Sequence, residues 1–180
     1  MAVVTLDSAV LTGLNTAPIT AAQAGRGGPA LPRRVSDFIT VNSGDSIAST
    51  YRLCRLPTFA KVKSVIVASM VATAGSADIN IAFSDSTFDG TSAANQGTVP
   101  QMAAANNKLF GAAVSLVGTG QKVDCTFLNT TNYPVNSPTL SLWEVLGYAT
   151  NPGGMFDIFL KVTTAITTGG LIYIDVTYDV

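Results

Sequence analysis

The sequence contains no histidine and a single glutamate, Glu144, and its charged residues amount to 12% of the chain. An average soluble domain carries roughly 25% charged residues, because these side chains keep its surface solvated. In their place stand small or neutral residues, among them 22 Thr, 14 Ser, 10 Asn, 23 Ala and 16 Gly. Such side chains pack against another protein at little desolvation cost. The composition therefore predicts a surface that is largely covered by neighbours in an assembly.

The missing histidine also limits the chemistry that the chain can perform. Histidine is the side chain that titrates near neutral pH unaided, and without it neither a Ser-His-Asp triad nor a Cys-His pair can form. A pair of carboxylates for glycoside cleavage stays formally possible. The acidic residues, however, are mostly Asp at expected turns or outward strand positions, where they usually serve as solvated surface. We therefore expect no enzyme and no catalytic residues.

Cysteines and acidic residues are too sparse to predict a cofactor. Cys54 and Cys125 are too few for a disulfide scaffold, and we expect two buried thiols, with a disulfide between them as the alternative. With no second cysteine pair and no histidine, zinc is not expected. The stretch Asp85–Gly90 could form a calcium turn, but the last ligand position of an EF-hand loop would fall on Gln96. The sequence predicts neither a metal site nor a cofactor site.

The charge balance and the apolar runs exclude two kinds of partner. The formal net charge is −1, whereas nucleic-acid binding needs clustered Lys and Arg that displace counterions. The apolar runs stay well short of the ~18 residues that span a bilayer. The N-terminus has no basic region, so we expect no signal peptide. We expect no nucleic-acid partner and no membrane partner.

The first 35 residues differ from the rest of the 180-residue chain. Their apolar residues recur at spacings of three and four, which allows one short helical stripe; they are Val3, Leu6, Val10 and Leu14. The stretch Thr16–Pro32 is rich in Gly and Pro, which break helix and strand. We predict an N-terminal arm over residues 1–35 and a β-sandwich domain over residues 36–180. Fully extended, the arm reaches on the order of 115 Å, enough to cross to a neighbouring subunit, and a disordered tail is the alternative.

From Ser36 onward the hydrophobic pattern is that of β-strands. Both faces of residues 61–73 are apolar, which predicts a central strand or one that lies under a partner. Thr168-Gly169-Gly170 predicts a hairpin between the last two strands. About eight strands without a βαβ rhythm predict an all-β fold, an antiparallel jelly-roll-like β-sandwich. The expected strands are 37–42, 47–56, 61–73, 76–84, 109–117 (where a helix stays open), 121–128, 156–164 and 171–180.

The alternation of residue types predicts which face of each strand is buried. Residues 156–162 and 172–180 each present every second, apolar residue to the core. Ala77, Ile79, Ile81 and Phe83 are expected on one face of their strand, and Asp78, Asn80 and Ser84 on the other. Inward positions are also predicted for Val123, Cys125 and Phe127. A basic group is expected to face solvent or a partner edge; it consists of Arg52, Arg55, Lys61 and Lys63.

One segment favours a helix. Residues 138–147 can begin after a cap at Ser137 and end at Gly147, which can adopt the left-handed conformation. Trp143 and Leu146 would share a face, with the tryptophan as a plug over one end of the sandwich. The segments 85–108 and 129–137 are predicted to be long loops.

Three arginines cluster in or beside the arm: Arg26, Arg33 and Arg34. We expect them to pair with carboxylates of a neighbouring subunit. Solvated side chains, or a weak and salt-sensitive phosphate contact, are the alternatives. The candidate partner-binding residues are therefore Val3, Leu6, Val10, Leu14, Arg26, Arg33 and Arg34.

Several motifs resemble a known family. Ser49–Pro57 with Ala60–Val65, and Leu142–Gly147 with Asn151–Asp157, are similar to segments of structural proteins of tailed-bacteriophage virions. The Gly169-Gly170 pair and the closing strand with Val176-Thr177-Tyr178 fit as well, so that the resemblance covers roughly residues 37–180. It implies a small jelly-roll component of the phage particle, of a kind that decorates or cements the capsid. It brings no catalytic residues.

The resemblance implies a capsid decoration or cement protein on the exterior of the virion. Its partners would be the major capsid protein and further copies of itself, as a homo-trimer or dimer over junctions of the shell. The alternatives are another part of the virion, such as a head fibre base, a head-tail joining protein or a tail protein. A carbohydrate-binding module with a sugar site at Phe88 is less favoured, since Trp and Tyr are scarce.

Overall fold

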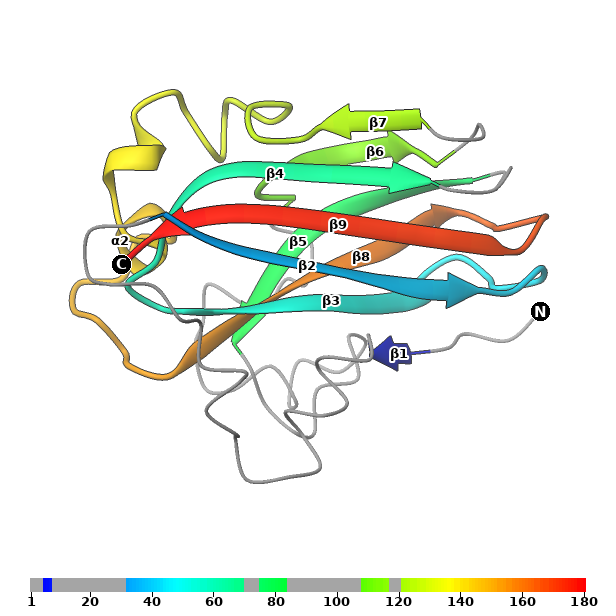
Figure 1. The fold of residues 1–180 in the computed structure, drawn as a ribbon, viewed down its shortest axis with the longest axis horizontal. Helices are drawn as coiled ribbons and strands as arrows, with labels where there is room; N and C mark the ends of the chain where they lie inside the picture. Colours follow the sequence, from blue (N-terminus) through cyan, green and yellow to red (C-terminus); the bar gives the residue numbers. More distant parts are fainter. Residues whose placement is uncertain (1–4, 8–31, 70–74, 84–107, 117–120) are drawn as a thin grey trace.

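The computed structural model describes residues 5–7, 32–69, 75–83, 108–116 and 121–180. Within them nine strands form two facing sheets, and a 3-10 turn and one short helix lie at one end (Figure 1). The strands are β1 (Thr5–Asp7), β2 (Arg33–Val41), β3 (Thr50–Pro57), β4 (Lys61–Ser69), β5 (Ser76–Phe83), β6 (Gly111–Ser115), β7 (Gln121–Asp124), β8 (Met155–Thr164) and β9 (Gly170–Asp179). The turn is η3 (Ser137–Thr139) and the helix is α2 (Leu142–Val145).

The order of the strands defines the fold. Sheet A has five strands in the order β1-β3-β8-β5-β6, and sheet B has four in the order β2-β9-β4-β7. From β2 onward the chain crosses to the other sheet at every connection except that from β5 to β6. Eight antiparallel strands in two sheets joined this way form a jelly roll, so the predicted all-β sandwich is confirmed. β4 lies between β9 and β7, as its two apolar faces predict.

The hairpin predicted at Thr168–Gly170 is wrong. β8 and β9 belong to different sheets, so this segment carries the chain across the sandwich instead of turning it back within one sheet. The connection passes close to the end of β2, since a side chain at Gly169 would come within 2.9 Å of the carbonyl oxygen of Val41. The glycine therefore permits a close backbone approach. A local turn signal does not show to which sheet each strand belongs.

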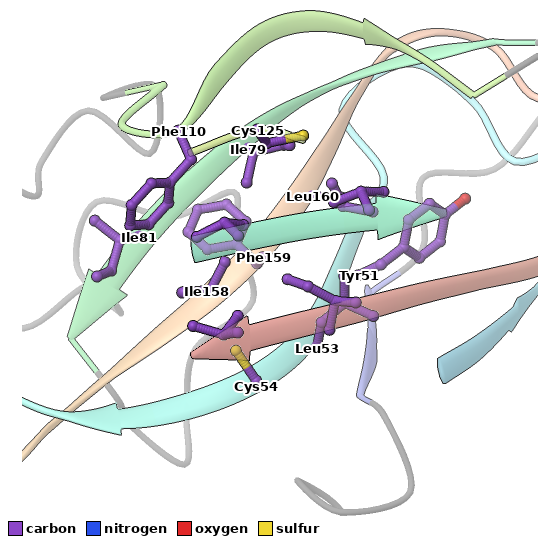
Figure 2. Close-up of a cluster of buried hydrophobic side chains, with 14 of the residues drawn as sticks. Tyr51, Leu53, Cys54, Ile79, Ile81, Phe110, Cys125, Ile158, Phe159 and Leu160 are labelled. Carbon is purple, nitrogen blue, oxygen red and sulfur yellow. The ribbon is translucent and has the colours of Figure 1, made fainter. Parts of the chain in front are cut away.

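The core fills the space between the two sheets. The alternating apolar residues of β8 and β9 are buried as predicted. Figure 2 shows Ile158 and Leu160 of β8 in one cluster with buried side chains of β3 and β5. Cys54 and Cys125 are both buried and both free, so the disulfide alternative is not realised. Burial raises the pKa of both thiols, that of Cys125 to about 12, which leaves them unreactive near neutral pH.

β7 is shorter than the sequence predicts, and Phe127 does not point inward. The strand ends at Asp124, whose carboxylate accepts hydrogen bonds from the backbone N–H of Thr126 (2.9 Å) and its hydroxyl (2.6 Å). This local turn competes with the strand pairing and ends it. The same two bonds lower the pKa of Asp124. Phe127 then lies in the following turns with its ring exposed.

The helix expected over residues 138–147 is divided into η3 and the single turn α2. Ser141, not Ser137, caps α2, and its backbone N–H donates to the Glu144 carboxylate at 2.7 Å. Gly147 follows with a φ of +78°, the left-handed conformation that the sequence predicts. The half-buried Trp143 packs against the core at this end of the sandwich, as expected for a plug.

Candidate functional site

The described part of the chain holds no group of three or more His, Cys, Asp and Glu that could bind a metal. No helix in the same residues has both the length and the apolar character that a bilayer crossing demands. The remaining candidates are ion pairs and exposed apolar side chains, which are features of protein contacts.

Most of the predicted arm contacts fall outside the described residues, namely Val3, Val10, Leu14 and Arg26. Leu6 is the middle residue of β1, so residues 5–7 form a strand where the spacing allowed a helix. β1 pairs in parallel with β3, with Leu6 opposite Tyr51. The edge of sheet A supplies backbone hydrogen-bonding partners there, and these outweigh a weak helical periodicity.

Arg33 and Arg34 both lie in β2, within the segment predicted as arm. Arg34 forms a bidentate pair with Asp175 of β9: Nε to Oδ1 is 2.7 Å and Nη2 to Oδ2 is 2.5 Å. The Asp175 carboxylate raises the pKa of the Arg34 guanidinium. Half-buried Arg33 stands opposite Tyr178 of β9 in the strand register. Arg34 thus has a carboxylate in its own chain, and a contact of these residues with a neighbouring subunit stays a prediction.

Arg52 and Arg55 do not face solvent, contrary to the prediction. Both contact the carboxylate of Asp157 in β8: Arg55 Nε lies 2.7 Å from Oδ1, and Arg52 Nε lies 3.1 Å from Oδ2. A β-bulge between Arg52 and Cys54 shifts the alternation of β3. The shift places both arginines on the outer face of sheet A, turned away from sheet B. There Arg52 is 2% exposed and Asp157 is fully buried, so the cluster is structural.

The rest of the predicted basic group lies elsewhere. Lys61 and Lys63 belong to β4, which is in sheet B, so they are not neighbours of the two arginines. Lys63 is exposed as expected; its Nζ lies 3.2 Å from Asp179 and donates to the carbonyl of Pro138 at 2.7 Å. The four basic residues therefore do not form one patch.

Asp78 and Asn80 lie on the predicted face of β5, but this face is buried as well. Asp78 Oδ1 accepts the backbone N–H of Ala113 at 2.8 Å, and Asn80 Oδ1 accepts that of Lys108 at 2.7 Å. Lys108 and Ala113 both have a φ of +49°, a left-handed conformation that is unfavourable for residues with a side chain. The two hydrogen bonds stabilise the backbone in this conformation at and before β6. The two polar side chains position backbone. The side chain of Phe83 and all of Ser84 lie outside the described residues, as does most of the 85–108 loop with Phe88 and the calcium candidate.

Exposed apolar side chains gather at one end of the sandwich. We call this end, made of residues 57–60 and 125–155, the neutral end; Figure 1 shows it on the side of α2. Seven large apolar side chains are exposed in the described residues: Phe59, Phe127, Leu128, Val135 and Met155 at the neutral end, Phe38 on the outer face of sheet B, and Ile47 near the opposite end. Five of the seven therefore belong to the two segments at this end of the sandwich.

The segments that form the neutral end contain almost no charged residues. Between Asp124 and Asp157 the sequence has one charged residue, Glu144, and residues 57–60 have none. The Glu144 carboxylate accepts the backbone N–H of Ser141 at the start of α2. Sequence reasoning missed this surface, although the long uncharged stretch was a readable signal. What the periodicity could not show is that the apolar residues in it are left exposed.

Comparison with solved structures finds a similar fold in a chain of a phage capsid. A chain of the capsid of Ralstonia phage GP4 superposes with a TM-score of 0.60 at 14% sequence identity, and the match covers 97% of this chain and 97% of that one. The two chains share a fold. A chain of the cyanophage Pam1 capsid asymmetric unit matches at a TM-score of 0.38 and 14% identity, over 91% and 93% of the two chains, and this score does not establish a shared fold. No protein-family model and no curated protein matches the sequence.

Proposed function

We propose that this chain is a structural protein of a bacteriophage virion, and within the virion a decoration or cement protein on the capsid exterior. The observation that carries the proposal is the fold match with a chain of the GP4 capsid over nearly the whole length of both chains. The motif resemblance in residues 37–180 points the same way. The low charge of the chain fits a protein whose surface is covered in an assembly.

The proposed role is passive and needs no catalysis or cofactor. A protein that binds the assembled lattice of the major capsid protein better than its free subunits stabilises the lattice by mass action. Repeated contacts from a dimer or trimer make a modest affinity per contact sufficient, because linked sites bind with avidity. The outer face of sheet B, where the Arg34 side chain and Phe38 are exposed, is available for contacts between the copies of such an oligomer.

The test of the function uses capsid shells that lack this protein. Purified protein is mixed with undecorated shells of the phage that encodes it, and bound protein is measured by co-sedimentation and located by cryo-electron microscopy. A decoration protein saturates at one site for every junction of the shell. Density confined to a single vertex, a fibre or the tail would assign the chain to another virion part. Absence of binding to any part of the particle would refute a virion role.

The arm is proposed to contribute to this binding through Leu6 and the other predicted anchors. Deleting residues 2–31 removes the arm and leaves β2 complete, including the Arg34–Asp175 pair. We expect the truncated sandwich to fold and to lose shell binding. A truncated protein that decorates shells as well as the full chain would show that the arm is dispensable. The division predicted between residues 35 and 36 falls within β2 (Arg33–Val41), so the truncation keeps the whole of that strand.

A further inference from the structure

We propose that the neutral end is the surface by which this chain docks on the capsid shell, an inference that rests on the proposed function. Its occupant is a neutral, apolar surface presented by the assembled major capsid protein. Five of the seven exposed large apolar side chains in the described residues lie there, and Val135 is 76% exposed. Large apolar side chains that are exposed in number at one end of a protein are unfavourable in water and are typical of contact sites.

The charge of the neutral end selects the class of partner. A nucleic acid or an anionic lipid surface is bound through clustered Lys and Arg, whereas residues 57–60 and 125–155 contain neither. Lys63 of β4 borders this end, and its ammonium group is engaged with the carbonyl of Pro138 and lies near Asp179. A charged protein surface would lose its solvation there without a charged partner in return. The single carboxylate, that of Glu144, is engaged with the backbone of Ser141. The partner that fits is an apolar protein surface with few ionic groups.

The exposed residues belong to turns that buried side-chain contacts hold in place. Tyr133 is fully buried, and its hydroxyl donates to the carbonyl of Val62 at 2.6 Å. Its ring packs against Phe110 with centroids 4.9 Å apart, and the ring of Phe127 lies 6.2 Å away. On the other side of the end, the Thr58 hydroxyl donates to the Asn151 side chain at 2.7 Å. Docking on such a surface requires little further ordering, so more of the contact energy appears as affinity.

A second copy of this chain is the competing occupant, and the arrangement favours the shell. Self-association can use the outer face of sheet B, where Arg34 and Asp175 neutralise each other and Phe38 is 54% exposed. That face runs along the length of the sandwich, whereas the neutral end closes it. A subunit that stands on a shell beside its copies presents an end to the shell and a long face to a neighbour.

The experiment places a charge in the neutral end and at matched positions elsewhere. Val135→Asp and Leu128→Asp alter the neutral end, while Ile47→Asp near the opposite end, at a side chain 59% exposed, is the control for shell binding. Phe38→Asp on sheet B, at a side chain 54% exposed, alters the face assigned to self-association. All four side chains are exposed, so each variant is expected to unfold at nearly the temperature of the unchanged protein. The dissociation constant for undecorated shells is measured for each, together with the oligomeric state by light scattering.

We expect each neutral-end substitution to weaken shell binding by about tenfold or more, as for a central contact residue, with Ile47→Asp within about twofold of the unchanged protein. Shell binding that is unchanged in both Val135→Asp and Leu128→Asp would overturn the docking surface and leave the proposed function standing. Failure of the unchanged protein to bind shells would refute the proposed function itself. Loss of the oligomer in Val135→Asp, with Phe38→Asp unaffected, would assign the neutral end to a second copy and overturn the proposal.

Discussion

The outer faces of the two sheets carry the same kind of ion pair in opposite surroundings. On sheet A, Arg52 and Asp157 are 2% and 0% exposed, whereas on sheet B, Arg34 and Asp175 are 64% and 12% exposed. The face of sheet A is closed to solvent over this region, and Phe159 beside Arg52 is buried too. The face of sheet B is open. The same type of ion pair is therefore buried on one side of the sandwich and keeps its arginine in contact with solvent on the other.

The two ion pairs contribute differently to stability because they differ in their contact with water. Two charges taken out of water lose their hydration and depend on each other and on further hydrogen bonds. Asp157 meets this demand with contacts to both Arg52 and Arg55. A pair near the surface keeps much of its hydration, and salt screens it. Stability should therefore respond strongly to changes on sheet A and weakly to changes on sheet B.

The largest effect is expected from Asp157→Ala. The substitution removes the carboxylate that both guanidinium groups contact and leaves positive charge in a buried position. Removing one partner of a buried pair costs about 3–5 kcal/mol, which we expect to see as a lower free energy of unfolding in urea. Asp157→Asn, which keeps the shape of the side chain, is the control, and its free energy of unfolding should lie between those of Asp157→Ala and the unchanged protein. A loss below about 1 kcal/mol, typical of an exposed pair, would break the contrast between the faces.

A smaller effect is expected from Asp78→Ala, also on the outer face of sheet A. The backbone N–H of Ala113 in β6 loses its acceptor, and Lys108 loses the carboxylate 3.6 Å from its Nζ. An unsatisfied buried donor costs about 1–3 kcal/mol. Hydrogen exchange should show faster opening of β6, while β9, in the other sheet, should stay protected. Equal acceleration in both strands would mean that Asp78 does not act locally on β6.

Much of the sandwich was predictable because core-facing residues alternate where a strand has one buried face. The rows in residues 156–162 and 172–178, the central position of β4 and the left-handed Gly147 follow from local chemistry. The jelly-roll class follows from the number of such segments and the lack of helical ones. These features depend on periods of a few residues, which a sequence displays directly.

The features that the sequence did not predict depend on contacts between distant segments. Nothing in Tyr51–Arg55 signals the bulge that brings two arginines over Asp157. The alternation around Asp78 indicated two faces but not that both are buried. The glycines at 169–170 looked like a hairpin because turn chemistry is local, whereas the assignment of β8 and β9 to different sheets is global. For the same reason the apolar residues of the neutral end read as core or loop, and their exposure became visible only in three dimensions.

The smallest effect is expected from Arg34→Ala on sheet B. Asp175 keeps its place on β9 and its carboxylate can be hydrated from the open face, so the unfolding midpoint should move far less than in Asp157→Ala. Raising the salt concentration to about 1 M, where the Debye length is roughly 3 Å, should remove most of the remaining difference. A double-mutant cycle with Asp175→Ala separates the pair from other contacts of the two residues. If Arg34→Ala were instead as destabilising as Asp157→Ala and insensitive to salt, the outer face of sheet B would be part of the folded core and could not be a surface reserved for neighbours.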